Sequence, residues 1–277
     1  MQRQKIKKFV PSPIWNAGSR LYWSWYNRGR HLTAKVFSPR WQQSVQQLRS
    51  YHNLHQGKRC FIIGNGPSLR KMDLQPLRKE ITFGLNRIYL LFPELGFSTT
   101  YMVLINELVL EQCVNDLLAL PMPRFITWRS RKYYAKNPGI IFLDSDYTAA
   151  EKFSPILTAR VFEGFTVTFM AMQLAYYMGF SEAILIGVDH NYTTQGVPNT
   201  TVISGGDDPN HFASAYFGKG FRWQLPDLAG SERAYRLAKQ AYEQDGRRIL
   251  DATVGGKLTI FPKVEFETLF QGSIIKA

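Results

Sequence analysis

Residues 59–69 read Arg-Cys-Phe-Ile-Ile-Gly-Asn-Gly-Pro-Ser-Leu, and this stretch decides the fold. Its apolar half is typical of a buried strand, and the glycines and proline that follow indicate a tight turn. Glycines let a backbone approach a ligand and expose amide groups to a phosphate. The spacing matches neither GxGxxG nor GxxxxGK[ST], so the usual dinucleotide and P-loop interpretations fail. The candidate nucleotide-binding residues of this turn are Gly64, Asn65, Gly66, Pro67 and Ser68. A plain strand-to-helix turn is the alternative.

Apolar runs and helical patterns alternate along the rest of the chain. We predict further strands at residues 81–85, 100–105, 124–127, 140–143, 183–188 and 248–252. We predict helices at residues 107–120, 166–178 and 231–244. This alternation predicts an α/β fold with a Rossmann-like parallel sheet and helices on both faces.

Polar residues stand directly after four of the predicted strands. They are Asn65, Asn86, Asn106 and Asp189. In parallel sheets ligands bind outside the carboxyl ends of the strands, so we expect these four side chains to form one nucleotide site. Each of them alone is an ordinary turn residue.

Two further features belong to the expected site. Thr166 and Thr168 begin the buried helix, where hydroxyl groups donate to a phosphate or simply cap the helix. Residues 191–228 form a long polar connection without a clear periodic pattern. A connection of that length is usually a lid or a binding loop, so we predict a lid there.

The net charge of +13 is concentrated at the N-terminus. Residues 1–59 contain twelve Lys and Arg and no acidic residue, whereas the remainder is nearly neutral. A neutral body argues against nucleic-acid binding. We divide the chain into a basic arm, residues 1–56, and a nucleotide-binding transferase domain, residues 57–277.

The arm combines its charge with aromatic residues that favour a membrane interface. These are Trp15, Tyr22, Trp23, Trp25, Tyr26 and Trp41. No run approaches the roughly 18 apolar residues of a spanning helix, and no signal peptide is expected. We therefore predict a cytoplasmic protein held peripherally on the anionic inner face of a membrane. An arm docked on the body or on a second subunit of a homo-oligomer is one alternative, and an RNA-binding or targeting tail is another.

Three stretches together resemble a known superfamily. They are residues 62–69, residues 83–89 (Phe-Gly-Leu-Asn-Arg-Ile-Tyr) and residues 172–189, which end in Gly-Val-Asp. They look like motifs of the bacterial sialyltransferases of glycosyltransferase family 42. They also resemble the related domain of flagellin-glycosylating motility proteins and of the archaeal 6-hydroxymethylpterin diphosphokinase. The resemblance covers roughly residues 58–270 and is specific for the superfamily but not for the substrate.

The resemblance implies an inverting glycosyltransferase that needs no metal. Its donor would be a CMP-linked sialic acid or related nonulosonate, and its acceptor a glycan or a lipid-linked glycan. It implies a lid histidine as the base, here His211, with His190 as the competitor, since an imidazole suits proton removal near neutral pH. Tyr192 and Tyr216 are the candidates for contacting the leaving phosphate. The Thr166-Val167-Thr168 segment departs from the family pattern, which has Ser-Gly after the first threonine.

Other interpretations stay open. The pterin branch implies a Mg²⁺-dependent diphosphokinase, for which Asp189, Asp207 and Asp208 are the candidate ligands. Asp207 and Asp208 are equally a solvated acidic turn, or the hydrogen-bond partners of a surface histidine. A non-catalytic nucleotide-binding scaffold is the third interpretation.

Overall fold

We describe the protein from a computed structural model in which residues 37–147, 152–194 and 196–273 are described. The chain divides into two compact units, residues 1–46 and 47–277. The predictions for the aromatic and basic arm fall largely on residues 1–36, which lie outside the described residues. None of the described helices is both long and apolar enough to span a bilayer.

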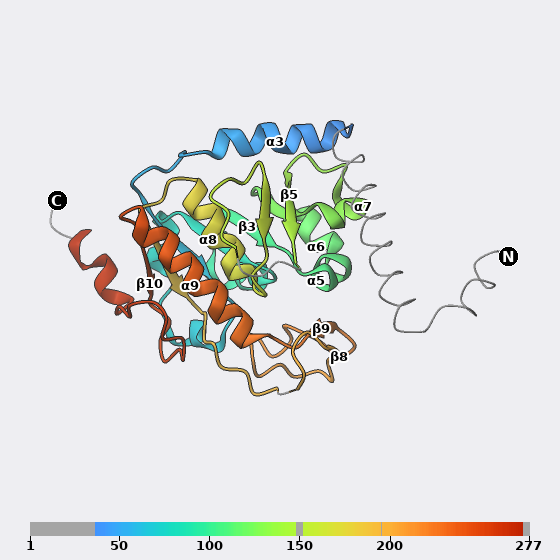
Figure 1. Ribbon diagram of the computed structural model, residues 1–277. Coiled ribbons are helices and arrows are strands. Elements are labelled where there is room, and N and C mark those ends of the chain that lie inside the picture. Colours follow the sequence, from blue (N-terminus) through green and yellow to red (C-terminus); the bar gives the residue numbers. More distant parts are fainter. Residues whose placement is uncertain (1–36, 148–151, 195, 274–277) are drawn as a thin grey trace, which may run out of the picture. The chain divides into compact units, whose positions relative to one another are not determined.

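The second unit is an α/β structure (Figure 1). The strands are β1 (Arg59–Ile63), β2 (Thr82–Leu85), β3 (Tyr101–Leu104), β4 (Arg124–Thr127), β5 (Ile140–Asp146), β6 (Arg160–Phe162), β7 (Glu182–Ile186), β8 (Thr201–Ile203), β9 (Arg222–Gln224) and β10 (Arg248–Asp251). The α-helices are α3 (Pro39–Tyr51), α4 (Phe92–Leu95), α5 (Glu107–Gln112), α6 (Val114–Ala119), α7 (Arg131–Tyr134), α8 (Val167–Tyr177) and α9 (Leu228–Gln244). The 3₁₀ helices are η1 (Pro67–Lys71), η2 (Gln75–Lys79), η3 (Ile88–Leu91), η4 (Trp128–Ser130) and η5 (Glu267–Ser273).

Eight of the described strands form one parallel sheet in the order β10-β7-β1-β2-β3-β4-β5-β6. The chain runs outward from β1 to β6 and then returns to place β7 on the other side of β1. In the register, Ile63 of β1 pairs with Gly84 of β2 and with Ile186 of β7. The strand order therefore reverses between β1 and β7, which is where open parallel sheets bind their ligands. The predicted Rossmann-like fold is confirmed.

Both faces of the sheet are covered. Helix α8 is buried along almost its whole length because it packs on β1, β2 and β3 and is itself covered by α9. The Tyr242 hydroxyl of α9 donates to the Met172 carbonyl of α8 at 2.8 Å. On the opposite face the Phe61 ring stacks on Phe270 of η5, with ring centres 5.7 Å apart. This double cover explains why β1 and β7 are continuous apolar runs rather than alternating ones.

Three predicted elements differ from the observed ones. The helix expected over residues 107–120 is two short helices, α5 and α6, because Cys113 leaves the helical conformation with φ −114° and ψ 26°. Strand β6 was not predicted, since three residues are too short to show a period. The lid was expected to lack regular structure, but β8 and β9 form an antiparallel hairpin within it. Figure 1 shows this hairpin, whose strand β9 contacts α5 through Gln112 and Arg222.

Candidate active site

A cavity of about 120 Å³ lies at the carboxyl ends of β1 and β7, where the strand order reverses. Its walls come from the glycine loop after β1, the segment after β7, the start of α8, the lid and the first turns of α9. The residues that line it are Gly64, Asn65, Gly66, Leu85, Phe165, Thr166, Val167, Thr168, Gly187, Val188, Asp189, His190, Asn191, Tyr192, Asn210, His211, Pro226, Leu228, Ser231 and Tyr235.

The glycine loop passes too close to the segment after β7 for any side chain. A Cβ at Gly64 would overlap the Gly187 carbonyl, and a Cβ at Gly66 would overlap Oδ2 of Asp189. Gly187 itself has φ +65°, a left-handed conformation that favours glycine. The amide of Gly64 donates to the Ile186 carbonyl at 2.8 Å, and that of Gly66 to the Gly187 carbonyl at 2.8 Å. Both glycines are therefore required by packing between strand ends.

Asp189 holds the glycine loop in place. Its two carboxylate oxygens accept hydrogen bonds from the Ser68 amide at 3.1 Å and the Ser68 hydroxyl at 2.7 Å. Burial raises the pKa of the Asp189 carboxyl, while the bonds from Ser68 act in the opposite direction. Asp189 lines the cavity, but the bonds it makes organise the loop. Ser68 and Pro67 do not line the cavity.

Two asparagines carry buried amide oxygens that have no hydrogen-bond partner among the described residues. Oδ1 of Asn65 and Oδ1 of Asn86 are both in this state. Unsatisfied buried polar atoms are rare in native proteins and call for an explanation. Asn65 lines the cavity, but its Oδ1 is buried and is not itself exposed to the cavity. Asn86, in a left-handed conformation with φ +47°, follows the lining residue Leu85 but does not line the cavity itself.

Asn106 has a structural role. Its Oδ1 accepts hydrogen bonds from the amides of Leu108 and Val109 at 2.9 and 3.3 Å, so it is the N-cap of α5. It does not line the cavity. The structure thus brings Asn65 and Asp189 together at one cavity and leaves Asn106 outside it.

Thr166 and Thr168 combine the two roles that the sequence left open. Thr166 is the N-cap of α8, since its hydroxyl accepts from the Thr168 amide at 3.3 Å. Both threonines also line the cavity. The Tyr235 hydroxyl of α9 lies 3.4 Å from the Thr166 hydroxyl. The cavity therefore receives the positive end of an 11-residue helix together with three hydroxyl groups.

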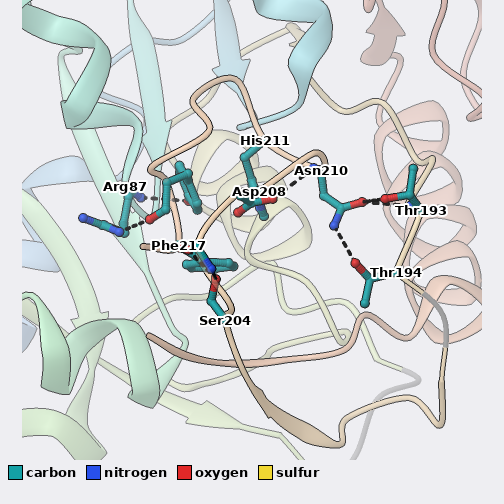
Figure 2. Close-up of polar contacts among 10 residues, drawn as sticks. Arg87, Thr193, Thr194, Ser204, Asp208, Asn210, His211 and Phe217 are labelled. Atoms are coloured by element: carbon teal, nitrogen blue, oxygen red, sulfur yellow. Dashed lines mark hydrogen bonds and ion pairs between the residues drawn. The ribbon is translucent and has the colours of Figure 1, made fainter. Parts of the chain in front are cut away.

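His211 is fixed by a buried carboxylate (Figure 2). Its Nδ1 lies 2.7 Å from Oδ2 of Asp208, whose side chain is only 4% exposed. Oδ1 of Asp208 accepts a hydrogen bond from the backbone amide of Asn210 at 2.9 Å, which fixes the carboxylate in turn. A carboxylate on Nδ1 selects the tautomer in which Nε2 is free to accept a proton. This is the arrangement that a histidine base requires.

Tyr216 lies beneath that imidazole. The two rings are stacked with centres 4.0 Å apart and planes 6° from parallel. The Tyr216 hydroxyl accepts a hydrogen bond from the backbone amide of Arg87 at 3.2 Å. The Arg87 guanidinium donates a hydrogen bond to the Tyr216 carbonyl. Tyr216 is buried and does not line the cavity. It supports His211 and anchors the lid to the segment after β2.

Tyr192 and His190 both line the cavity. Tyr192 lies edge-on to His211, with ring centres 6.3 Å apart, and burial raises the pKa of its phenol. A phenol that stays protonated is a hydrogen-bond donor for a phosphate oxygen. His190 has φ +53°, and its Nε2 lies 3.1 Å from Oε1 of Glu232, a more exposed carboxylate than Asp208. The pKa of Glu232 is lowered, and this hydrogen bond with His190 is the main cause.

The three aspartates proposed as alternative metal ligands are not gathered into one site. Asp189 is bonded to Ser68, and Asp208 to His211 and the Asn210 amide. Asp207 is exposed and does not line the cavity. Within residues 37–147, 152–194 and 196–273, no group of three His, Cys, Asp or Glu is arranged to hold a metal ion.

Several residues of the site were missed by the sequence reasoning. Asn210 is 5% exposed and joins two parts of the lid, because its side chain bonds to the Thr193 amide at 2.8 Å and the Thr194 hydroxyl at 2.9 Å (Figure 2). Tyr235 and Phe165 also line the cavity. Nothing in the sequence pattern marks Asn210 or Tyr235. Phe165, between Gly164 and a helix cap, carried a weak turn signal.

The cavity is smaller than most ligand sites, which measure roughly 300–1,000 Å³. A nucleotide sugar needs more room than about 120 Å³. The lid is joined to the glycine loop by a hydrogen bond from the Phe212 amide to the Asn65 carbonyl at 2.8 Å. Nε of Arg70 donates to the Phe212 carbonyl at 2.8 Å. These two bonds hold Phe212 against the glycine loop and η1, and a nucleotide sugar does not fit the cavity with residues 191–228 in this position.

One family model matches this chain. The family described as 6-hydroxymethylpterin diphosphokinase MptE-like matches residues 38–195, which confirms the resemblance drawn from the motifs. A glycosyltransferase, "MAf", from Magnetospirillum magneticum AMB-1 shares 14% identity with a TM-score of 0.48. The match covers 82% of this chain and 38% of that one, so this chain spans well under half of that protein.

A mammalian sialyltransferase in complex with Gal-beta-1-3GalNAc-ortho-nitrophenol shares 10% identity with a TM-score of 0.34. The match covers 77% of this chain and 79% of the sialyltransferase chain. The comparison with curated proteins gives no match. These two structural similarities are too weak to support a statement about the activity of this chain.

Proposed function

The chain belongs to the 6-hydroxymethylpterin diphosphokinase MptE-like family. Within that family we propose, from the geometry of the site, that it is an inverting glycosyltransferase. Its donor is a nucleotide-activated sugar, for which a CMP-linked nonulosonate fits best. Its acceptor is a hydroxyl group of a glycan or of a lipid-linked glycan. The observation that carries the proposal is a cavity at the β1–β7 reversal that combines a glycine loop, a helix N-terminus and a histidine fixed by a buried carboxylate.

The charge of the cavity favours a donor with a single phosphate. No Lys or Arg is among the residues that line it within the described part of the chain. A CMP-nonulosonate carries one negative charge on its phosphodiester and one on its sugar carboxylate, and amides, hydroxyl groups and a helix N-terminus suit the phosphodiester. Among the described residues of the lining, the one carboxylate, that of Asp189, is engaged by Ser68. A triphosphate carries about four charges and is usually held by Lys, Arg or a metal ion. A CMP-sugar therefore suits these walls better than ATP does.

The reaction is a single displacement at the anomeric carbon. Nε2 of His211 takes the proton of the acceptor hydroxyl, and the acceptor oxygen forms the bond to the anomeric carbon. The bond from that carbon to the phosphate oxygen breaks, and the phosphate leaves with the electron pair. Asp208 stabilises the imidazolium that forms, and Tyr192 with the start of α8 donates to the leaving phosphate. Configuration is inverted because the acceptor attacks opposite the leaving group.

A diphosphokinase is the second candidate, and the family match favours it. That reaction uses ATP with Mg²⁺, and the described aspartates do not fit such an ion. Asp189 and Asp208 have their oxygens engaged by protein donors, and Asp207 lies away from the cavity. The reaction described above therefore assigns no role to a metal ion.

Turnover in the presence of a chelator separates the two candidates. The full-length protein is incubated with CMP-sialic acid and an acceptor glycan, with and without EDTA, and release of CMP is measured. In parallel it is given ATP, Mg²⁺ and 6-hydroxymethylpterin. The proposal expects CMP release that EDTA leaves unchanged. Diphosphate transfer to the pterin, abolished by EDTA, would establish the kinase instead.

The N-terminal arm supports a further part of the proposal. Residues 1–36 contain eight Lys and Arg, no acidic residue and three tryptophans. Such a segment binds anionic lipid surfaces. We propose that it brings the enzyme to a lipid-linked acceptor at the cytoplasmic face of a membrane. A variant without residues 1–36 should lose binding to phosphatidylserine vesicles while keeping turnover of soluble substrates. Equal vesicle binding with and without these residues contradicts the placement.

A further inference from the structure

Phe165 occupies an unusual position at the edge of the cavity. It lines the cavity and is 36% exposed, whereas most phenylalanines of the chain are buried. It immediately precedes Thr166, the N-cap of α8. The ring therefore stands next to the place where the proposed function puts a phosphate.

The backbone of Phe165 is strained. Its φ is +62°, a left-handed conformation that is unfavourable for a residue with a Cβ. Gly164 before it is also left-handed, with φ +56°. Strain of this kind collects at functional sites, where the surroundings hold a side chain in a required place. Glycine or asparagine is the ordinary occupant of such a position, so the aromatic ring needs a reason.

The ring is held from one side. A Cβ built on Gly230, in the first turn of α9, would overlap Cδ2 of Phe165 and lie 2.8 Å from Cγ and Cε2. The ring thus rests against the bare backbone of Gly230. The Arg233 guanidinium of the same helix lies 5.9 Å from the ring centre. This packing holds one part of the ring, while Phe165 stays 36% exposed and lines the cavity.

We infer that Phe165 is a stacking platform for a flat heteroaromatic ring, carried by the ligand within one ribose or one methylene group of its phosphate. The inference rests on the proposed function, because that function places the phosphate at the start of α8. A nucleobase and a pterin share this chemistry, and the proposed function commits to the base of a nucleotide sugar. Phe165 is then a determinant of ligand specificity.

The test compares ligands with and without the flat ring. Titration calorimetry measures CMP and ribose 5-phosphate binding to the wild-type protein and to Phe165→Ala. Stacking of a base on an aromatic side chain predicts a CMP affinity about 5-fold to 150-fold weaker in the variant. Ribose 5-phosphate, which keeps the phosphate and loses the base, should bind both proteins equally. Phe165→Tyr should restore CMP binding.

Two more variants exclude a merely structural role. Phe165→Gly removes the ring and accepts the left-handed backbone, so it should fold and still lose CMP affinity. Phe97→Ala is the matched control, because the Phe97 ring also lies beside a guanidinium, that of Arg78 at 5.2 Å. Phe97 precedes β3 and so lies at the amino ends of the strands, whereas the cavity lies at their carboxyl ends. Phe97→Ala should bind CMP like the wild type.

The outcomes separate this inference from the proposed function. Undiminished CMP binding by Phe165→Ala, or an equal loss for CMP and ribose 5-phosphate, overturns the platform and leaves the proposed function standing. A wild-type protein that binds 6-hydroxymethylpterin phosphate and ignores CMP overturns the proposed function. In that case a loss of pterin-phosphate binding in Phe165→Ala still supports the platform, and its absence overturns it. If the wild-type protein binds neither CMP nor 6-hydroxymethylpterin phosphate, both the stacking platform and the proposed function are overturned.

Discussion

The glycine loop, residues 64–68, and the lid, residues 191–228, meet at one cavity but are held in different ways. The loop is fixed by backbone bonds to the neighbouring strand end and by the carboxylate of Asp189. The lid is held by side chains from distant segments. Arg87 binds Tyr216, and Gln112 exchanges two hydrogen bonds with the backbone of Arg222, at 2.8 and 2.9 Å. In the proposed function the sheet supplies the surface for phosphate, whereas the lid supplies the imidazole that acts as the base.

The largest expected effect concerns the reactive group of the lid. His211→Ala should lower kcat by about 10²–10⁴, the usual contribution of a general base. CMP affinity should change little, because the glycine loop is untouched. His190→Ala is the matched control and should retain most of kcat, since its partner Glu232 is more exposed. Steady-state kinetics on both variants decides the assignment, and the reverse ranking makes His190 the base.

The glycine loop should respond in stability rather than in chemistry. Gly66→Ala places a Cβ on Oδ2 of Asp189 and breaks the Ser68 contact, so it should cost on the order of 2–4 kcal/mol of unfolding free energy. Gly205→Ala is the control, because a Cβ there meets nothing within 4 Å. Urea unfolding measures both. A Gly66→Ala protein as stable as Gly205→Ala would show that the loop is not held as described.

Asp208 should act through His211. Asp208→Asn keeps an acceptor for Nδ1 but removes the negative charge, so we expect kcat to fall about 10-fold or more with KM unchanged. Asp208→Glu should recover part of the rate. An intact kcat in Asp208→Asn would make Asp208 a structural residue only.

A smaller effect is expected from the pH dependence of stability. Burial raises the pKa of Asp189 above its ordinary value of 3.8, so the folded protein holds this proton more tightly than the unfolded chain does. The carboxyl therefore contributes stability below its unfolded pKa, and that contribution is lost as pH rises through the folded pKa. Asp189→Asn should lack this decline above pH 3.8, measured by urea unfolding across pH. Parallel pH curves for the two proteins would contradict the assignment.

The same contrast explains what the sequence could predict. The strands of the sheet are apolar runs with polar residues at their ends, and the rule for parallel sheets places those ends at one edge. Asn65 and Asp189 were located in that way. Asn106 also follows a strand, but its side chain caps the helix that begins at Glu107. Asparagine commonly takes that role, so the sequence alone allowed both interpretations.

The lid was less predictable for a physical reason. Its conformation depends on contacts between residues far apart in sequence, such as Arg87 with Tyr216, and no local period records them. His211 was proposed from the family resemblance, and its pairing with Asp208 was considered only as the alternative to catalysis. The structure shows that pairing, and a buried carboxylate on Nδ1 is what a histidine base requires. The stacking of Tyr216 under His211 had no sequence signal.

The central claim is that the cavity beside the glycine loop binds a nucleotide. Its most direct test is the calorimetric Kd of CMP for the wild type, for Asn65→Asp and for Asn106→Asp. Asn65→Asp replaces the buried amide by a carboxylate that repels phosphate, so CMP should bind at least about 10-fold more weakly. Asn106→Asp keeps an equally good helix cap and should bind as the wild type does. Equal affinity of all three proteins for CMP, or none in the wild type, would contradict the account.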